Sequence, residues 1–148
     1  MDEESDILEL VTTFLSDSQN SVNTVEIIPC VELYPKESGF PLIGVMDGGD
    51  ILDEGASESL EKHLVFVVCY DQVTGDRSAC VKSVRAKGRE SRQLLENSAK
   101  FESGGALDEF NSVSYKRSDN ARVLEETEEE YTCFKTHVFE FRRRVVTL

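Results

Sequence analysis

Residues 59–72 read SLEKHLVFVVCYDQ and carry the clearest strand pattern of the chain. Successive side chains of a strand point to opposite faces, and both faces of this segment are apolar. One face carries His63, Val65, Val67 and Cys69, and the other carries Leu64, Phe66, Val68 and Tyr70. Such a strand either lies at the centre of a covered sheet or packs its second face against another chain.

The sequence before this strand predicts one helix and two shorter strands. A helix is predicted over about residues 3–18, because apolar side chains recur there at helical spacing and carboxylates crowd its start, where the helix dipole favours them. Its apolar face consists of Ile7, Leu8, Val11, Phe14 and Leu15. β-Branched residues predict a strand over 22–28, and a second strand over 42–46 leads into an acidic loop.

The sequence after the central strand predicts a second helix and two more strands. The helix is expected over about residues 77–97, with a thin apolar stripe and a weak point at Gly88. Strands are expected over 110–116 and 131–146, the latter after a run of glutamates. The element order is therefore α-β-β-β-α-β-β. We expect an α+β fold with a mostly antiparallel sheet of four to five strands and two helices packed on one face.

Length and charge bound the classes of function. The 148 residues fit one domain spanning 1–148, and 39% hydrophobic residues can supply a core. The chain has 16 Lys and Arg against 29 Asp and Glu, a formal net charge of −13. A surface of this sign repels a phosphate backbone, which argues against DNA or RNA binding through a broad basic face.

Neither a membrane segment nor a disulfide framework is expected. The longest apolar run, 64–70, has the length of a strand and is far shorter than a membrane-spanning helix. The acidic opening 1–4 lacks the basic start of a signal peptide, so we expect a soluble protein that is not secreted. The four cysteines form no C-x-x-C pair, and we interpret them as reduced and mostly buried.

The sequence shows no convergent catalytic, metal-binding or cofactor-binding pattern, so an enzyme is not expected. His63 and His137 each lie within a strand, where packing or an interface accounts for a histidine more often than catalysis does. The carboxylates of 47–54 do not have the spacing of a calcium loop, and no lysine follows Gly48 and Gly49 as a phosphate loop requires. We therefore expect no metal and no cofactor.

Charges of opposite sign are segregated along the chain. A solvated loop or an exposed helix face accounts for each charged segment, but unlike patches also suit head-to-tail self-assembly into a closed ring. The acidic candidates for interface or channel contacts are Asp47, Asp50, Asp53, Glu54, Glu125, Glu126, Glu128, Glu129 and Glu130, and the basic candidates are Arg85, Arg89 and Arg92.

The arrangement resembles the tail terminator proteins of long-tailed bacteriophages, with neighbouring neck families similar in size and topology. The resemblance covers nearly the whole chain and rests on element order. The features that carry it are the short helix 7–15, the Pro-apolar-Asp-Gly segment 40–49, the long strand 60–70, the helix ending near 92–95, the strand with Tyr115 and the final strand ending at 139–142.

The resemblance implies a virion structural protein of the tail or neck that is assembled in the host cytoplasm. Six copies would form a ring that caps the tail tube protein, ends tube polymerisation and joins a head–tail connector or stopper protein. Genome DNA would pass through the channel without specific binding, and no membrane would be involved. The acidic run 125–130 is then a candidate for the channel lining, and 47–54 is a candidate for subunit or tube contact.

A second hypothesis belongs to another class of protein. The charge of −13 also fits a small acidic DNA mimic that inhibits a nucleic-acid-binding protein of the host. Binding to a single basic host protein, without affinity for tube protein, would favour this alternative. An enzyme with an unrecognised carboxylate site is the third reading, and no acid–base pair in the sequence supports it.

Overall fold

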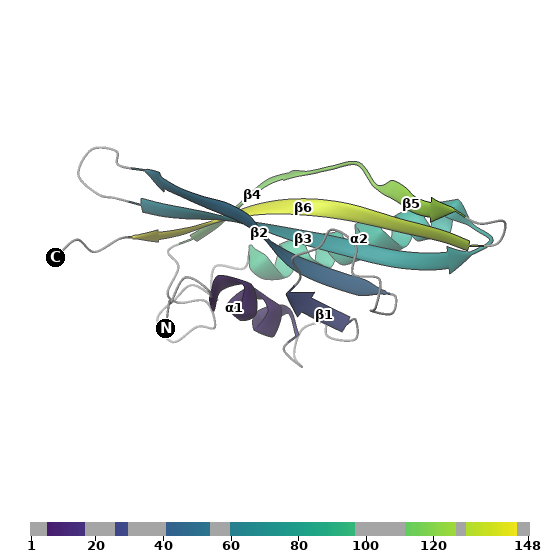
Figure 1. The fold of residues 1–148 in the computed structure, drawn as a ribbon, viewed down its shortest axis with the longest axis horizontal. Helices are drawn as coiled ribbons and strands as arrows, with labels where there is room; N and C mark the ends of the chain where they lie inside the picture. The colour runs from purple at the N-terminus through teal and green to yellow at the C-terminus, as the bar shows by residue number, and fades with distance from the viewer. Residues whose placement is uncertain are drawn as a thin grey trace.

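The computed structural model describes residues 6–16, 26–29, 41–53, 60–96, 112–126 and 130–144. These residues form two helices and six strands of one sheet (Figure 1). The elements are α1 (Asp6–Leu15), β1 (Glu26–Pro29), β2 (Leu42–Asp53), β3 (Leu60–Thr74), α2 (Arg77–Leu95), β4 (Ser112–Ser118), β5 (Arg122–Glu126) and β6 (Glu130–Arg144). The predicted α+β class and element order are confirmed, with β5 as one short strand more than expected.

The sheet is mostly antiparallel, as predicted, and β3 lies at its centre. The strand order is β1-β2-β3-β6-β4, and β5 also pairs with β6. β1 and β2 run parallel, whereas the remaining pairs are antiparallel. β3 and β6 pair along their whole length, from Leu60 opposite Arg144 to Thr74 opposite Glu130. This long pair runs along the long axis of the elongated molecule in Figure 1.

Both helices pack on the same face of the sheet, as the sequence predicts. α1 lies against β1 and β2, and α2 lies against β3 and β6. The apolar sides of both helices join one buried cluster with the inward-facing residues of the strands. Its members are Ile7, Val11, Phe14, Leu15, Ile43, Val45, Val65, Val67, Cys69, Cys80, Val84, Leu95, Cys133, Phe139 and Phe141.

The face of β3 that carries Val68 and Tyr70 is largely buried within the chain itself. Leu42, Val68 and Tyr70 are fully buried within the chain and form a second apolar cluster. Phe66 and Phe134 pack against it and are half-buried. Of the two alternatives predicted for this strand, burial within the chain accounts for the central part of this face, because the chain itself removes these side chains from water.

The predicted acidic loop at 47–54 is, as far as Asp53, part of strand β2. The register with β3 shifts between Asp47 and Gly49, which marks a β-bulge. A methyl group at Gly48 would lie 2.8 Å from Cβ of Leu64, and Gly49 has a φ of 97°. Both positions therefore require glycine, and together they form a bulge within the strand. In the sequence alone, the same two glycines indicate the end of a strand.

The glutamate run 125–130 is divided between two strands. Glu125 and Glu126 belong to β5, opposite Thr132 and Tyr131, and Glu130 begins β6. The sequence does not predict β5, because glutamate is depleted in strands and a charged run suggests a solvated turn. Pairing with β6 overrides that local preference here.

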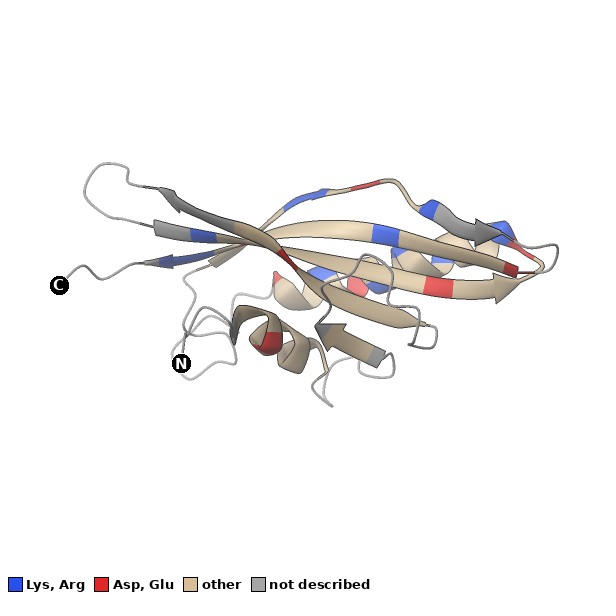
Figure 2. Ribbon diagram, viewed as in Figure 1, with Lys and Arg blue, Asp and Glu red and all other residues tan. Residues whose placement is uncertain are grey.

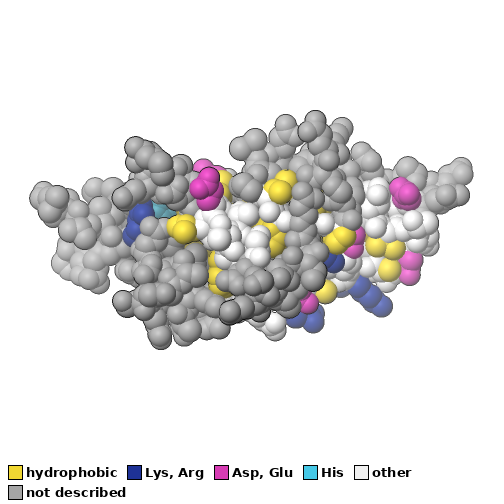
Figure 3. Space-filling view, turned by 90° about the horizontal axis from the view of Figure 1, so that it is seen from below, with side chains coloured by type: hydrophobic (Ala, Val, Ile, Leu, Met, Phe, Trp, Pro, Cys, Tyr) yellow, Lys and Arg dark blue, Asp and Glu magenta, His cyan; other side chains and the backbone are white. Residues whose placement is uncertain are grey.

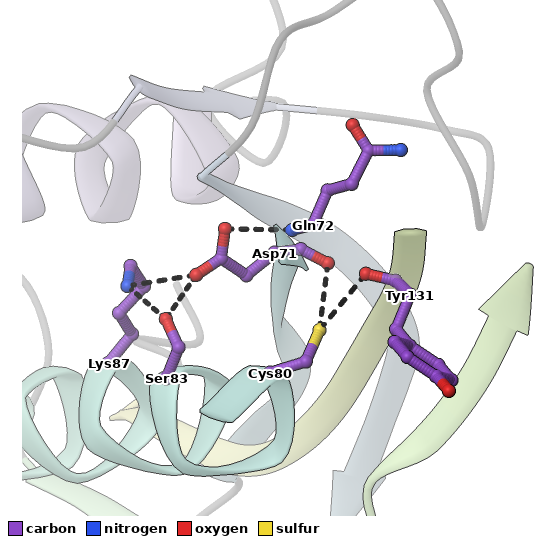
Figure 4. Close-up of polar contacts among 6 residues, drawn as sticks. All are labelled: Asp71, Gln72, Cys80, Ser83, Lys87 and Tyr131. Carbon is purple, nitrogen blue, oxygen red and sulfur yellow. Dashed lines mark hydrogen bonds and ion pairs between the residues drawn. The ribbon is translucent and has the colours of Figure 1, made fainter. Parts of the chain in front are cut away.

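Three of the four cysteines are free and buried, which confirms their predicted state, while Cys30 lies outside the described residues. Burial raises the pKa of Cys69 to about 12, and burial together with the Cys133 thiol raises the pKa of Cys80 to about 12. The Cys80 Sγ also lies 3.4 Å from the Asp71 carbonyl oxygen and 3.3 Å from that of Tyr131 (Figure 4). Thiolates are the reactive form, so these thiols should be inert in the folded chain.

We therefore expect Cys69, Cys80 and Cys133 to resist a maleimide at pH 7 and to react once the chain is unfolded in guanidinium chloride. Mass mapping of the labelled peptides measures the protection of each position separately. Rapid labelling of any of the three under native conditions would contradict the burial of that thiol.

Candidate functional site

A basic pocket lies between α2 and strands β4 and β6. Its volume is about 250 Å³. The pocket is lined by Arg85, Arg89 and Arg92 of α2, Tyr115 of β4, and Lys135 and His137 of β6. Lys and Arg positions recur along α2, beside the basic position in the middle of β6 (Figure 2). The structure thus brings together all three of the basic candidates singled out in the sequence.

The three arginines share one side of α2 because they stand four and three residues apart. An adjacent side of the helix is buried on the sheet through Cys80, Val84, Gly88, Ser91 and Leu95. The helix begins after Asp76, whose Oδ1 accepts a hydrogen bond of 3.2 Å from the Ala79 amide. This N-cap and the apolar side together fix which residues of α2 face the pocket.

A polar contact at one flank of α2 ties the helix to β3. The Lys87 Nζ donates to the Ser83 Oγ at 2.7 Å and lies 3.8 Å from the Asp71 carboxylate. The Ser83 hydroxyl donates to the same carboxylate (Figure 4). The charge of Lys87 is therefore paired within the chain, and Lys87 lies on a different side of α2 from the three arginines of the pocket.

Arg92 and Tyr115 form the wall of the pocket on the β4 side. The Arg92 guanidinium lies 3.9 Å from the centre of the Tyr115 ring, and its Nε donates to the Glu96 Oε1 at 2.8 Å. The Tyr115 ring packs edge-on against Phe139 at 5.3 Å between centroids. A guanidinium stacked on a ring that is itself held by the core has little freedom to move.

His137 forms the floor of the pocket and is neutral at pH 7. Its side chain is 5% exposed, and its Nδ1 shares a hydrogen bond of 3.0 Å with the Tyr115 hydroxyl. Burial, reinforced by the charges of Lys135 and Arg92, lowers the pKa of His137 to about 4. Within the described part of the chain, Nε2 has no hydrogen-bond partner, and it faces α2 at Gly88. The histidine is thus a packed residue under a positively charged wall.

Arg85 and Arg89 are exposed and have no carboxylate partner among the described residues. Lys135 donates its Nζ to the backbone oxygen of Asp119 at 2.8 Å, which leaves its charge uncompensated. Five other described cations do have carboxylate partners. The described ion pairs are Lys87–Asp71, Arg92–Glu96, Lys116–Glu140, Arg117–Asp119 and Arg142–Glu140. Three neighbouring cations without a carboxylate partner among the described residues make the pocket electrostatically suited to an anion.

The acidic candidates that the structure describes are distributed over β2, β5 and β6. Asp47 is exposed on β2 and accepts a hydrogen bond from the Gly49 amide at 2.9 Å. The backbones of Asp50 and Asp53 also lie in β2, and Glu130 is exposed at the start of β6. Glu54, Glu128 and Glu129 fall outside the described residues.

Tyr115, Lys135 and His137 were not predicted as parts of this site. The spacing of Lys135 and His137 is a usable signal, because residues two apart on a strand share a face. What the sequence does not reveal is that α2 crosses the same face with three arginines. The arginines of α2 and the pair on β6 meet in one pocket only because α2 packs across β3 and β6.

The arrangement suits recognition of anions. Among the described residues there is no group of three or more His, Cys, Asp or Glu that could hold a metal ion. No described helix has the length and apolar character needed to cross a membrane. Four cations and a tyrosine hydroxyl around an open pocket would hold carboxylate or phosphate oxygens through charge-assisted hydrogen bonds.

Comparison with known proteins yields a likeness of fold. No known family model matches the sequence, and no curated protein matches it either. Among solved structures, a chain from the virion of a native gene transfer agent particle is similar, with a TM-score of 0.52 and 12% sequence identity. The likeness covers 94% of this chain and 95% of that chain, so the two share one fold over essentially their whole length.

Proposed function

We propose that this chain is a structural, non-enzymatic protein of a virion or virion-like particle. The observation that carries the proposal is the likeness of fold, over 94% of the chain, to a component of a gene transfer agent virion. The finer role that fits the sequence best is a ring that caps the tail tube, ends its growth and joins the tail to a head connector. A formal net charge of −13 supports this role, because a negative channel wall lets DNA slide without adhering.

Segregation of charge supports assembly into a ring. The basic pocket and the glutamates of β5 and β6 belong to different segments of one chain, so a contact between them in successive copies would be head-to-tail. Head-to-tail contacts either close into a ring or continue as a filament, and a ring is what a tube terminus requires.

The oligomeric state tests this proposal. Light scattering of the purified chain, alone and with tube protein, should give an assembly of about six times the 16.6 kDa chain mass. Tubes polymerised with the protein present should stop growing and carry a ring at one end in negative-stain micrographs. A monomer at high concentration that neither assembles with tube protein nor limits tube length would contradict the proposed role.

A further inference from the structure

We propose that the basic pocket binds the terminal phosphate group of a small molecule. The pocket is the space of about 250 Å³ between α2, β4 and β6. The inference goes beyond the proposed function and does not depend on it, because every residue that carries it belongs to a single chain. A phosphate in the pocket would compete with glutamates of a neighbouring copy, so a carboxylate probe belongs to the test.

Cationic side chains reach the pocket from two elements. They are Arg85, Arg89 and Arg92 of α2, which span about 10 Å at about 1.5 Å per residue, and Lys135 of β6. Arg92 is paired with Glu96, whereas the other three have no carboxylate partner among the described residues. Figure 3 shows Lys and Arg side chains on the lower edge of the surface seen from below. The pocket therefore offers an excess of positive charge to an anion that enters from solvent.

The number and type of these cations favour phosphate over carboxylate. A phosphate monoester carries a charge of about −1.5 to −2 at pH 7 and three acceptor oxygens, whereas a carboxylate carries one charge and two oxygens. Phosphate therefore compensates three cations more fully than a carboxylate does. Three of the four cations are arginines, whose planar guanidinium donates two parallel hydrogen bonds to phosphate oxygens.

The size of the pocket limits the ligand to one charged group. Pockets that enclose a whole small molecule measure about 300–1,000 Å³, so the smaller volume here accommodates a phosphate and leaves the rest of the molecule outside. His137 closes the floor, since it is 5% exposed and its Nδ1 shares a hydrogen bond with the Tyr115 hydroxyl. The imidazole thus lies next to any ligand that fills the pocket and can report on its binding.

The charge of the whole chain disfavours a nucleic acid as the source of the phosphate. At physiological ionic strength, charges farther than about 8 Å from a small anion are largely screened, so the cations of the pocket dominate its binding. A DNA duplex extends far beyond the pocket and meets the surface of a chain whose formal net charge is −13. A small phosphate compound therefore fits the pocket better than a phosphodiester backbone does.

The imidazole NMR signals at pH 7 test the assignment, because the chain has two histidines. Methyl phosphate should shift the signals of His137. It should not shift those of His63, which is four residues along β3 from Val67, the residue opposite His137. Dimethyl phosphate and acetate, each with one charge, should bind about tenfold more weakly. No response to methyl phosphate, equal binding of acetate, or a stronger response to a DNA duplex would each overturn the inference.

Single substitutions on α2 separate the pocket from general attraction between charges. R85Q and R89Q should each weaken methyl phosphate binding by about tenfold, since each removes a hydrogen bond to a charged group. R77Q is the matched control, because Arg77 is exposed on the same helix, twelve residues and about 18 Å from Arg89, and should leave binding unchanged. An equal loss in R77Q would overturn the inference. All three arginines are exposed, so circular dichroism should show native folds, and R85Q and R89Q replace each other if one variant unfolds.

The glutamate run 125–130 of the same chain provides a separate control. Thr132, opposite Glu125, lies three residues along β6 from Lys135. E125Q/E126Q should bind methyl phosphate as the wild type does. A gain in affinity of about tenfold would show that the run occupies the pocket in the wild type and would overturn the inference. A monomer that binds methyl phosphate would support the pocket and contradict the ring, whereas a ring that does not bind it would do the reverse.

Discussion

Replacing Gly88 by alanine is expected to destabilise the folded chain by about 1–3 kcal/mol, although alanine is the better helix former by about 1 kcal/mol. Gly88 lies in the middle of α2 and is buried against β6. A methyl group built at this position overlaps the imidazole of His137, with Nε2 as the nearest atom. The helix would have to lift from the sheet, or the histidine would have to leave its place under Tyr115.

Guanidinium chloride unfolding of the wild type and of G88A measures this loss of stability. A86G is the matched control, because Ala86 is exposed on the same helix and should follow ordinary helix propensity, with alanine the more stable residue. Combining G88A with H137A should recover part of the loss, since the overlapping ring is then absent, and the double-mutant cycle gives the coupling between the two positions. A G88A protein at least as stable as the wild type would show that α2 does not approach β6 so closely.

Gly88 also illustrates which parts of the fold a sequence reveals. From the local sequence alone, Gly88 is expected to weaken the helix, and this expectation is correct for an isolated helix. The structure shows a different reason for the residue, which is close approach of α2 to a side chain 49 positions later in the sequence. By contrast, local periodicity predicts the start of α2 at Arg77 and its end to within two residues, and the central place of β3 is one of the two alternatives that its apolar faces allow. Gly48 is a second example, because the bulge between Asp47 and Gly49 depends on the pairing of β2 with β3.

The basic pocket can likewise be predicted only in part from the sequence. Arg85, Arg89 and Arg92 share a helix face by their spacing alone, so the sequence identifies them as a group. Their partners on β4 and β6 follow only from the sheet order, in which β6 lies between β3 and β4. Local patterns predict which side chains of one element act together, whereas the meeting of two elements is a property of topology.

The stability of the folded chain should fall by about 3 kcal/mol between pH 6.5 and pH 4 through His137. Burial, and then the charges of Lys135 and Arg92, lower its pKa from 6.5 to about 4. In this interval the unfolded chain takes up a proton that the folded chain refuses. The contribution is therefore fully present above pH 6.5 and is lost as the pH falls towards 4, at about 1.4 kcal/mol for each pKa unit.

Other groups titrate in the same range, so the measurement must be a difference between variants. Burial raises the pKa of Glu140, but hydrogen bonds and charges from Arg142 and Lys116 outweigh it and lower the pKa overall, so Glu140 also loses a stabilising contribution in acid. H137Q and H137N remove the imidazole while leaving Glu140 in place. Unfolding free energies measured from pH 7.5 to 4 should fall less steeply in both variants, by about 3 kcal/mol over the interval. Equal slopes in the wild type and both variants would mean that His137 is protonated in the folded chain, which would also remove the neutral floor on which the basic pocket is built.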